Sequence, residues 1–155
     1  MKLESTNTPC DSRVESDQEF FTMTETPADL KGLKVLVVED GVFTAMALEE
    51  LLAESGCHVV GPCSELDEAT AFAREAQIDV AVLDIDIEGK PAYGVADELQ
   101  RRGIPFIFAS GYDISRTPER LAGTIALEKP FDNEALLEAL RSAIARSQKG
   151  VMIRG

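Results

Sequence analysis

The sequence predicts an α/β protein in which a five-stranded parallel sheet carries helices on both faces. From residue 33 onward, short apolar stretches alternate with amphipathic stretches of about ten residues or more, which is typical of repeated strand–helix units. Three of the apolar stretches, 35–38, 80–83 and 106–109, are unbroken, as expected of strands buried on both faces of a parallel sheet. The predicted class is therefore a doubly wound sheet.

The elements can be placed in order along the chain. Strands are expected at 35–38, 58–61, 80–83, 106–109 and 124–127. Helices are expected at 42–55, 65–76 and 92–102, with Gly56 and Gly103 ending the first and third. Pro118 interrupts the weakly patterned segment 113–123, so any helix there is short. Asp132 can cap a last helix whose apolar face comprises Leu136, Leu137, Leu140 and Ile144.

One domain is expected, spanning residues 32–147. Residues 1–31 are polar and acidic without periodicity, which indicates a disordered tail, and 148–155 are expected to be a loose end. Within the tail, Ser16-Asp17-Gln18-Glu19 fits a capping box and is followed by Phe20, Phe21 and Met23. A short helix that docks on the domain or a partner is the alternative to a tail with scattered apolar residues.

Composition excludes several classes of function. The chain has 155 residues and a net charge of -13, which disfavours binding to nucleic acid or to an anionic membrane. No apolar stretch approaches the roughly 20 residues of a membrane helix, and the N-terminus lacks a signal-peptide core, so the cytoplasm is the expected location. Cys57 and Cys63 flank one strand, about 20 Å apart, too far for a disulfide. The single histidine, His58, is expected at the surface and excludes a histidine-rich metal site.

Polar side chains follow four of the predicted strands. They are the acid pair Glu39-Asp40, Asp84, Ser110 and Lys129. Because ligands of open parallel sheets bind just beyond the carboxyl ends of the strands, these groups are expected to meet at one edge. Each alone has a plainer interpretation, such as a helix cap, a turn residue or a solvated lysine; all of them in this order indicate a site.

Phosphoryl transfer to a carboxylate is the chemistry that this set favours. Asp84 is the candidate nucleophile, which would form an acyl phosphate. Glu39, Asp40 and Asp84 form an oxygen-rich, histidine-free site suited to Mg²⁺, with the backbone carbonyl of Asp86 as a further ligand. Lys129 can neutralise one phosphoryl oxygen and the Ser110 hydroxyl can donate to another, which provides the positioning and charge compensation that such a reaction needs.

Over residues 33–146 the chain resembles the receiver domains of two-component response regulators. The matching residues are Glu39-Asp40, Asp84 after an apolar strand, Ser110-Gly111 and Lys129-Pro130-Phe131. The resemblance implies a flavodoxin-like, CheY-like (βα)5 fold with strand order 2-1-3-4-5. It implies Asp84 as phosphoacceptor, Glu39 and Asp40 as metal-site acids, Ser110 as switch hydroxyl and Lys129 as phosphoryl-binding lysine. It also implies a cis peptide before Pro130.

A narrower resemblance concerns residues 108–112. Phe108-Ala109-Ser110-Gly111-Tyr112 is similar to the Phe-Ala-Thr-Gly-aromatic signature of a subclass of mostly stand-alone receivers, with Ser110 in place of threonine. Ordinary receivers place a switch aromatic three residues before the lysine, where this chain has Ala126. Tyr112 is therefore expected to take over part of the switch; a half-buried packing role is the alternative.

The expected function is that of a cytoplasmic single-domain response regulator. A histidine kinase or histidine phosphotransfer protein would donate the phosphoryl group to Asp84. The output would be protein–protein contact, or the chain would serve as a phosphate sink. It would catalyse its own phosphorylation and dephosphorylation without being an independent metabolic enzyme.

Two other functions compete with this expectation. A receiver-like adaptor would keep the fold and not depend on phosphorylation. A haloacid-dehalogenase-like phosphatase would use the Asp84-Ile85-Asp86 pattern. That family usually carries the pattern near its first strand, and the assignment leaves Glu39-Asp40 without a role.

Overall fold

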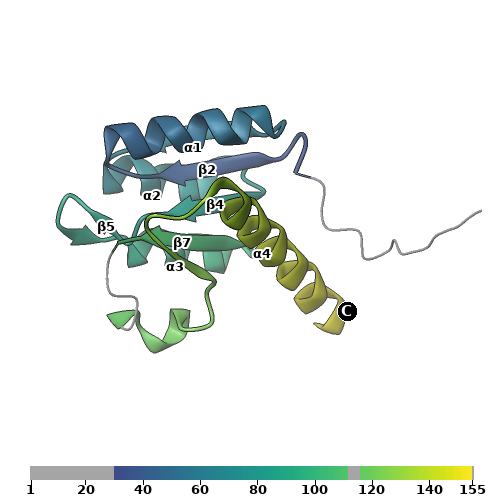
Figure 1. Cartoon of the computed structure of the whole chain (residues 1–155). Helices are drawn as coiled ribbons and strands as arrows, with labels where there is room; N and C mark the ends of the chain where they lie inside the picture. The colour runs from purple at the N-terminus through teal and green to yellow at the C-terminus, as the bar shows by residue number, and fades with distance from the viewer. Residues whose placement is uncertain (1–29, 112–115, 155) are drawn as a thin grey trace, which may run out of the picture.

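The computed structural model describes residues 30–111 and 116–154, with side chains described as far as Ser147. Strands and helices alternate along this part of the chain (Figure 1). The strands are β2 (Lys34–Val38), β3 (His58–Cys63), β4 (Val80–Leu83), β5 (Asp86–Ile87), β6 (Lys90–Pro91), β7 (Phe106–Ser110) and β8 (Ala126–Glu128). The helices are α1 (Val42–Glu54), α2 (Leu66–Glu75), α3 (Tyr93–Arg101), the single 3-10 turn η4 (Glu119–Leu121) and α4 (Asn133–Arg154).

Five of the strands form one parallel sheet in the order β3-β2-β4-β7-β8. Counted along the chain, this is the predicted order 2-1-3-4-5, so the doubly wound, flavodoxin-like fold is confirmed. The register between β2 and β3 shifts near Leu36, where the edge strand carries Gly61 and a cis bond to Pro62. A Cβ at Gly61 would lie 2.8 Å from the amide nitrogen of Cys63, so the shift depends on glycine there. The predicted cis bond before Pro130 is also present.

Alternate residues of the central strands face two apolar layers. Leu36, Leu83 and Phe108 point toward one layer, which α2 and α3 cover. Val37, Val82 and Ile107 point toward the other, which α1 and α4 cover (Figure 1). Because the central strands are buried on both faces, their polar groups can reach solvent only past the strand ends.

Two features differ from the predicted elements, and a third agrees with them. Residues 86–91, expected to be a loop, form the small antiparallel hairpin β5–β6. The helix α4 continues to Arg154, through residues 148–154 that were expected to be loose, because nothing between Asn133 and Arg154 other than Gly150 opposes helix. Among residues 117–123, only the 3-10 turn η4 is helical, in line with the short helix expected there.

Several expectations concern isolated residues. His58 is exposed on the edge strand β3, and Cys57 and Cys63 form no disulfide, as expected; both thiols are also buried. The N-terminal tail to residue 29 and Tyr112 lie outside the described residues, so the expectations for them stay predictions. Within the described part of the chain, no helix has the combination of length and apolar character that a bilayer crossing requires.

Candidate functional site

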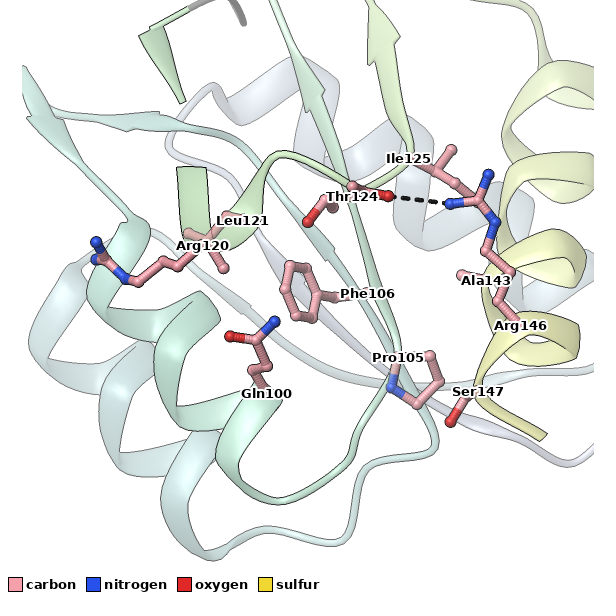
Figure 2. Close-up of a pocket in the computed structure, with 11 residues that line it drawn as sticks. Gln100, Pro105, Phe106, Arg120, Leu121, Thr124, Ile125, Ala143, Arg146 and Ser147 are labelled. Carbon is pink, nitrogen blue, oxygen red and sulfur yellow. Dashed lines mark hydrogen bonds between the residues drawn. The ribbon is translucent and has the colours of Figure 1, made fainter. Parts of the chain in front are cut away.

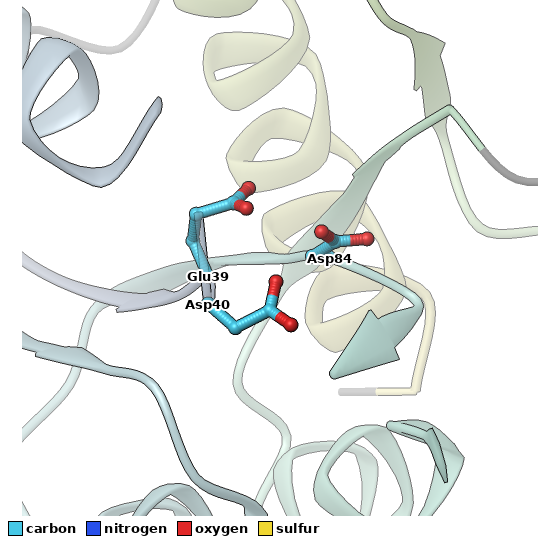
Figure 3. Close-up of side chains that lie close together, drawn as sticks. All are labelled: Glu39, Asp40 and Asp84. Atoms are coloured by element: carbon cyan, nitrogen blue, oxygen red, sulfur yellow. The ribbon is translucent and has the colours of Figure 1, made fainter. Parts of the chain in front are cut away.

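Three carboxylates meet at the carboxyl edge of the sheet. Glu39 and Asp40 follow β2, and Asp84 follows the neighbouring strand β4. One oxygen from each of the three side chains lies within 4.8 Å of the others (Figure 3). Glu39 and Asp84 are only 4% and 7% exposed, whereas Asp40 is half-buried. The sequence therefore predicted the convergence of these acids correctly.

The backbone of the parallel sheet continues past the last strand residues and holds these acids. The Glu39 amide donates to the Cys63 carbonyl at 2.9 Å, and the Asp84 amide donates to the Val38 carbonyl at 2.8 Å. Each acid is thus fixed to a neighbouring strand end, and the two buried carboxylates come close in spite of their like charge. Elements of the sheet, rather than flexible loops, set the spacing of the site.

Lys129 supplies the positive charge of the site. Its Nζ donates to Glu39 Oε1 at 2.7 Å and to Asp84 Oδ2 at 3.1 Å. The residue follows β8 and is held there by its own amide, which donates to the Ser110 carbonyl at 3.1 Å. Lys129, which follows β8, therefore joins the ends of β2 and β4 through its ammonium group and the end of β7 through its amide.

Burial and charge shift the protonation of this pair. Desolvation raises the pKa of Glu39 above its ordinary value, against the lowering effect of its bonds from Lys129 and from the Gly41 amide. Burial by itself would lower the pKa of Lys129, but its contacts with the Glu39 and Asp84 carboxylates outweigh burial and raise it. Lys129 is therefore charged at neutral pH, and the buried Glu39 depends on it.

Backbone amides that sequence reasoning missed complete the site. The Gly41 amide donates to Glu39 Oε2 at 2.9 Å, and a Cβ at Gly41 would lie 3.1 Å from that oxygen. In the β5–β6 hairpin, the Asp86 amide donates to Asp84 Oδ1 at 3.1 Å and the Glu88 amide donates to Asp40 Oδ2 at 2.7 Å. The available signals were Gly41 itself and the turn at Glu88-Gly89, where both residues have positive φ.

The other predicted site residues lie on the adjacent strands. Ser110 is the last residue of β7, 1% exposed, next to the strand that carries Asp84. Ala126 begins β8 opposite Phe108, whose ring packs edge-on against Tyr93 and Phe106. The small residue Ala126 thus occupies the position where other receivers have the switch aromatic. A cluster of aromatic rings lies beside it on the α3 side of the sheet. The backbone of Asp86 begins β5; its carbonyl as a metal ligand remains a prediction.

A second hollow lies elsewhere on the molecule. It has a volume of about 340 Å³ and is bordered by α3, the start of β7, the segment before β8 and α4 (Figure 2). Arg146 spans one side and donates to the Gly123 carbonyl at 3.0 Å. Phe106, which lines it, is at the opposite end of β7 from Ser110, so this hollow shares no residue with the acid site.

The fold and the cluster of acids with one lysine define the class of protein. Residues 35–141 match the family model of the response regulator receiver domain, and the chain belongs to that family. The assignment favours the receiver interpretation over the haloacid-dehalogenase-like one. It agrees with the confirmed strand order and gives Glu39-Asp40 a place in the site.

Individual relatives fall in the same family. The chain is 28% identical over 126 residues to the transcriptional regulatory protein PdtaR of Mycobacterium tuberculosis, covering 79% of this chain and 62% of that protein. It thus spans less than two thirds of that curated relative. The solution structure of SdrG from Sphingomonas melonis Fr1 is 32% identical with a TM-score of 0.65, covering 76% of this chain and 98% of that one.

A third comparison concerns the metal. The receiver domain of the sensor histidine kinase PA1611 from Pseudomonas aeruginosa PAO1 has the same fold, at 23% identity and a TM-score of 0.64. The match covers 74% of this chain and 98% of that domain, whose structure has magnesium coordinated in its active-site cleft.

Proposed function

We propose that this chain accepts a phosphoryl group on Asp84 from a phospho-histidine of a kinase or phosphotransfer protein, in the presence of Mg²⁺. The observation that carries the proposal is the contact of one lysine with two of three converging carboxylates. A cluster of buried acids is costly unless cations compensate it, so the arrangement indicates a site made for a cation and an anion together.

The side chains fit the cation that the family implies. Glu39, Asp40 and Asp84 offer only oxygen ligands, which suits Mg²⁺, and the carbonyl of Asp86 is proposed as a further ligand. When bound, Mg²⁺ would compensate the charge of the carboxylates and of an incoming phosphate. The amides of Gly41, Asp86 and Glu88 hold one oxygen on each acid. The other oxygens of Glu39 and Asp84 accept from Lys129, which would share them with a bound cation.

The proposed reaction is an in-line displacement. An oxygen of Asp84 forms the new bond to phosphorus as the bond between phosphorus and the donor imidazole breaks, and the electron pair returns to that imidazole. Lys129 lies 3.1 Å from Oδ2 of Asp84, within reach of the transferred group. We propose that Lys129 then moves from the carboxylates to a phosphoryl oxygen and that the Ser110 hydroxyl donates to another.

The consequence would be a change of surface that a partner protein reads. Phosphorylation adds charge at the sheet edge and redirects Lys129, whose amide is tied to Ser110. Signalling by protein contact and service as a phosphate sink both follow from this chemistry. The cytoplasmic location and the role of Tyr112 beside Ser110 remain predictions.

Incubation with acetyl phosphate and Mg²⁺, read by intact-protein mass spectrometry, tests the proposal. One phosphoryl group should be added, and chelation of Mg²⁺ or Asp84→Asn should prevent it. Asp79→Asn, in the loop before β4, is the matched control and should be labelled normally. A folded wild-type chain that gains no mass under these conditions would instead support the phosphorylation-independent adaptor.

A further inference from the structure

The helix α1 carries large apolar side chains in solvent. Val42, Phe43 and Met46 are 68%, 86% and 59% exposed, at the end of α1 nearest the acid site. Nothing in the described part of the chain covers them. Exposed phenylalanine beside other apolar groups on one helix turn is a feature of contact surfaces.

A groove continues from this patch along the side of α1. It has a volume of about 560 Å³. One wall is α1, from Phe43 to Leu51, and the other is the segment from Lys129 to Asn133 that joins β8 to α4. From Phe43 to Leu51 the helix rises about 12 Å, which is the length of eight helical residues. The groove is thus sized for a short apolar helix.

The N-terminal segment enters the domain at the other end of α1. Leu30 is 3% exposed and belongs to the same apolar cluster as Leu48 and Leu52. Its carbonyl accepts from Cys57 Sγ at 3.3 Å, and the Gly32 amide donates to the Gly56 carbonyl at 2.8 Å. Residues 1–29 are therefore attached beside the Leu51 end of the groove.

The attached segment is long enough to return along α1. From Leu30 back to Met23 the chain can extend about 23 Å, and back to Phe20 about 33 Å. The distance along α1 from Glu54 to Phe43 is only about 17 Å. Short flexible tethers give effective concentrations in the millimolar range, so a contact with a dissociation constant of about 1 mM would already be populated.

The sequence of the tail has the complementary chemistry. Phe20, Phe21 and Met23 supply apolar side chains within four residues, directly after the capping box that begins at Ser16. We propose that the segment 16–23 docks as a short helix in the groove beside α1 and covers Phe43. Since Met23 is closest to the tether, Asp17 and Glu19 come to the end of the groove lined by Lys129. That lysine is already paired with Glu39 and Asp84, so the docking rests on the apolar contacts.

This docking would regulate the proposed function. The segment would cover the α1 side of the edge that bears Asp84, and would thereby hinder a protein donor while leaving the site open to small molecules. This step rests on the phosphoacceptor role. A phosphoryl group near Lys129 would add negative charge next to Asp17 and Glu19 and would release the segment.

Paramagnetic NMR on the full chain tests the docking without any phosphorylation. A spin label is attached at Thr24→Cys in a Cys10→Ser background; Cys57 and Cys63 are buried and stay unlabelled. The amide signals of 43–51 should broaden, and those of the α2 residues 68–75, on the other face, should not. Replacing Phe20 and Phe21 by serine should abolish the broadening, as should Phe43→Ser. The control Leu3→Ser, in the same tail, should keep it.

Two results would overturn the docking. One is broadening of α1 that persists without Phe20 and Phe21. The other is intermolecular broadening. It would appear when spin-labelled chains without nitrogen-15 are mixed with nitrogen-15 chains that carry no spin label, and it would show that the occupant of the groove is a second copy.

The regulatory step has a separate readout. Beryllofluoride with Mg²⁺ should remove the broadening, and a segment that stays docked while Asp84 is occupied contradicts release. If beryllofluoride does not occupy Asp84, the phosphoacceptor proposal fails while the docking result stands on its own.

Discussion

Replacement of Lys129 by alanine should expose the electrostatic cost of the acid site. The ammonium lies 2.7 Å from Glu39 and 3.1 Å from Asp84, and these carboxylates have side-chain exposures of 4% and 9%. Removal of one partner from a buried ion pair costs about 3–5 kcal/mol. Because the lysine side chain is itself 23% exposed, screening favours the lower end, about 3 kcal/mol. Thermal unfolding should shift down by about 10 °C.

The loss of stability caused by Lys129→Ala should depend on pH in a defined direction. Burial already raises the pKa of Glu39, and loss of the Lys129 contacts, which lower it, raises it further. A carboxyl group whose pKa is higher in the folded state favours folding below its unfolded pKa and loses that advantage as pH rises through the folded pKa. The difference between variant and wild type should therefore be largest near neutrality and shrink as pH falls toward about 4.3, the ordinary value for glutamate.

Mg²⁺ should restore part of the lost stability. At ten times its dissociation constant, a ligand of the folded state adds about 1.4 kcal/mol. The gain should exceed that of wild type at equal concentration, because no ammonium competes for the carboxylates in the variant.

Urea unfolding at pH 5 and pH 7, with and without Mg²⁺, measures all three effects. Lys90→Ala, on the exposed strand β6, is the control for loss of one lysine and should unfold like wild type. A Lys129→Ala deficit that is the same at both pH values and unaffected by Mg²⁺ would show that packing, and not charge, is lost, and would refute this reasoning.

Three further predictions concern the scaffold. Phe108 is 1% exposed and lies between the rings of Tyr93 and Phe106, so Phe108→Ala should lower the free energy of unfolding in urea by about 3–5 kcal/mol. A loss as small as that of a substitution at an exposed residue would contradict its core position. The bidentate Arg120–Asp97 pair is 55% and 40% exposed, so a double-mutant cycle should give a small coupling that salt weakens. Burial, with a smaller contribution from the Glu68 charge, raises the pKa of Cys63 to about 12, so native chain at pH 8 should resist alkylation at Cys63 until urea unfolds it, as peptide mass spectrometry would show.

Much of the fold could be predicted because its signals are local and repeated. Val80–Leu83 is uniformly apolar and was assigned with its observed bounds. Once the strands are parallel, the strand ends share an edge, so Glu39, Asp40 and Asp84 had to converge. Each inference needed only periodicity and the rule that places ligands at carboxyl strand ends.

The remaining features depend on geometry that local patterns do not contain. The hydrogen bond from Lys129 to Glu39 joins residues 90 positions apart in the sequence. The spacing of the strands determines which of the several acids the lysine contacts. The β5–β6 hairpin pairs only two residues on each strand, too few for an alternating pattern. The extension of α4 beyond Ser147 was not predicted; Gly150, a poor helix former, lies within it.

In the β5–β6 hairpin, the backbone positions the acids, while the side chains determine the charge around them. The main-chain amides of residues 86 and 88 donate hydrogen bonds to Asp84 and Asp40. Any amino acid except proline provides such an amide. The side chain of Asp86 can consequently differ without moving the acids, whereas position 88, at positive φ, favours glycine, asparagine or aspartate. Substitution of these side chains can change the charge near an incoming phosphoryl group while the spacing of the acids stays constant. Reaction rates can thus change during evolution without a change in the positions of the acids.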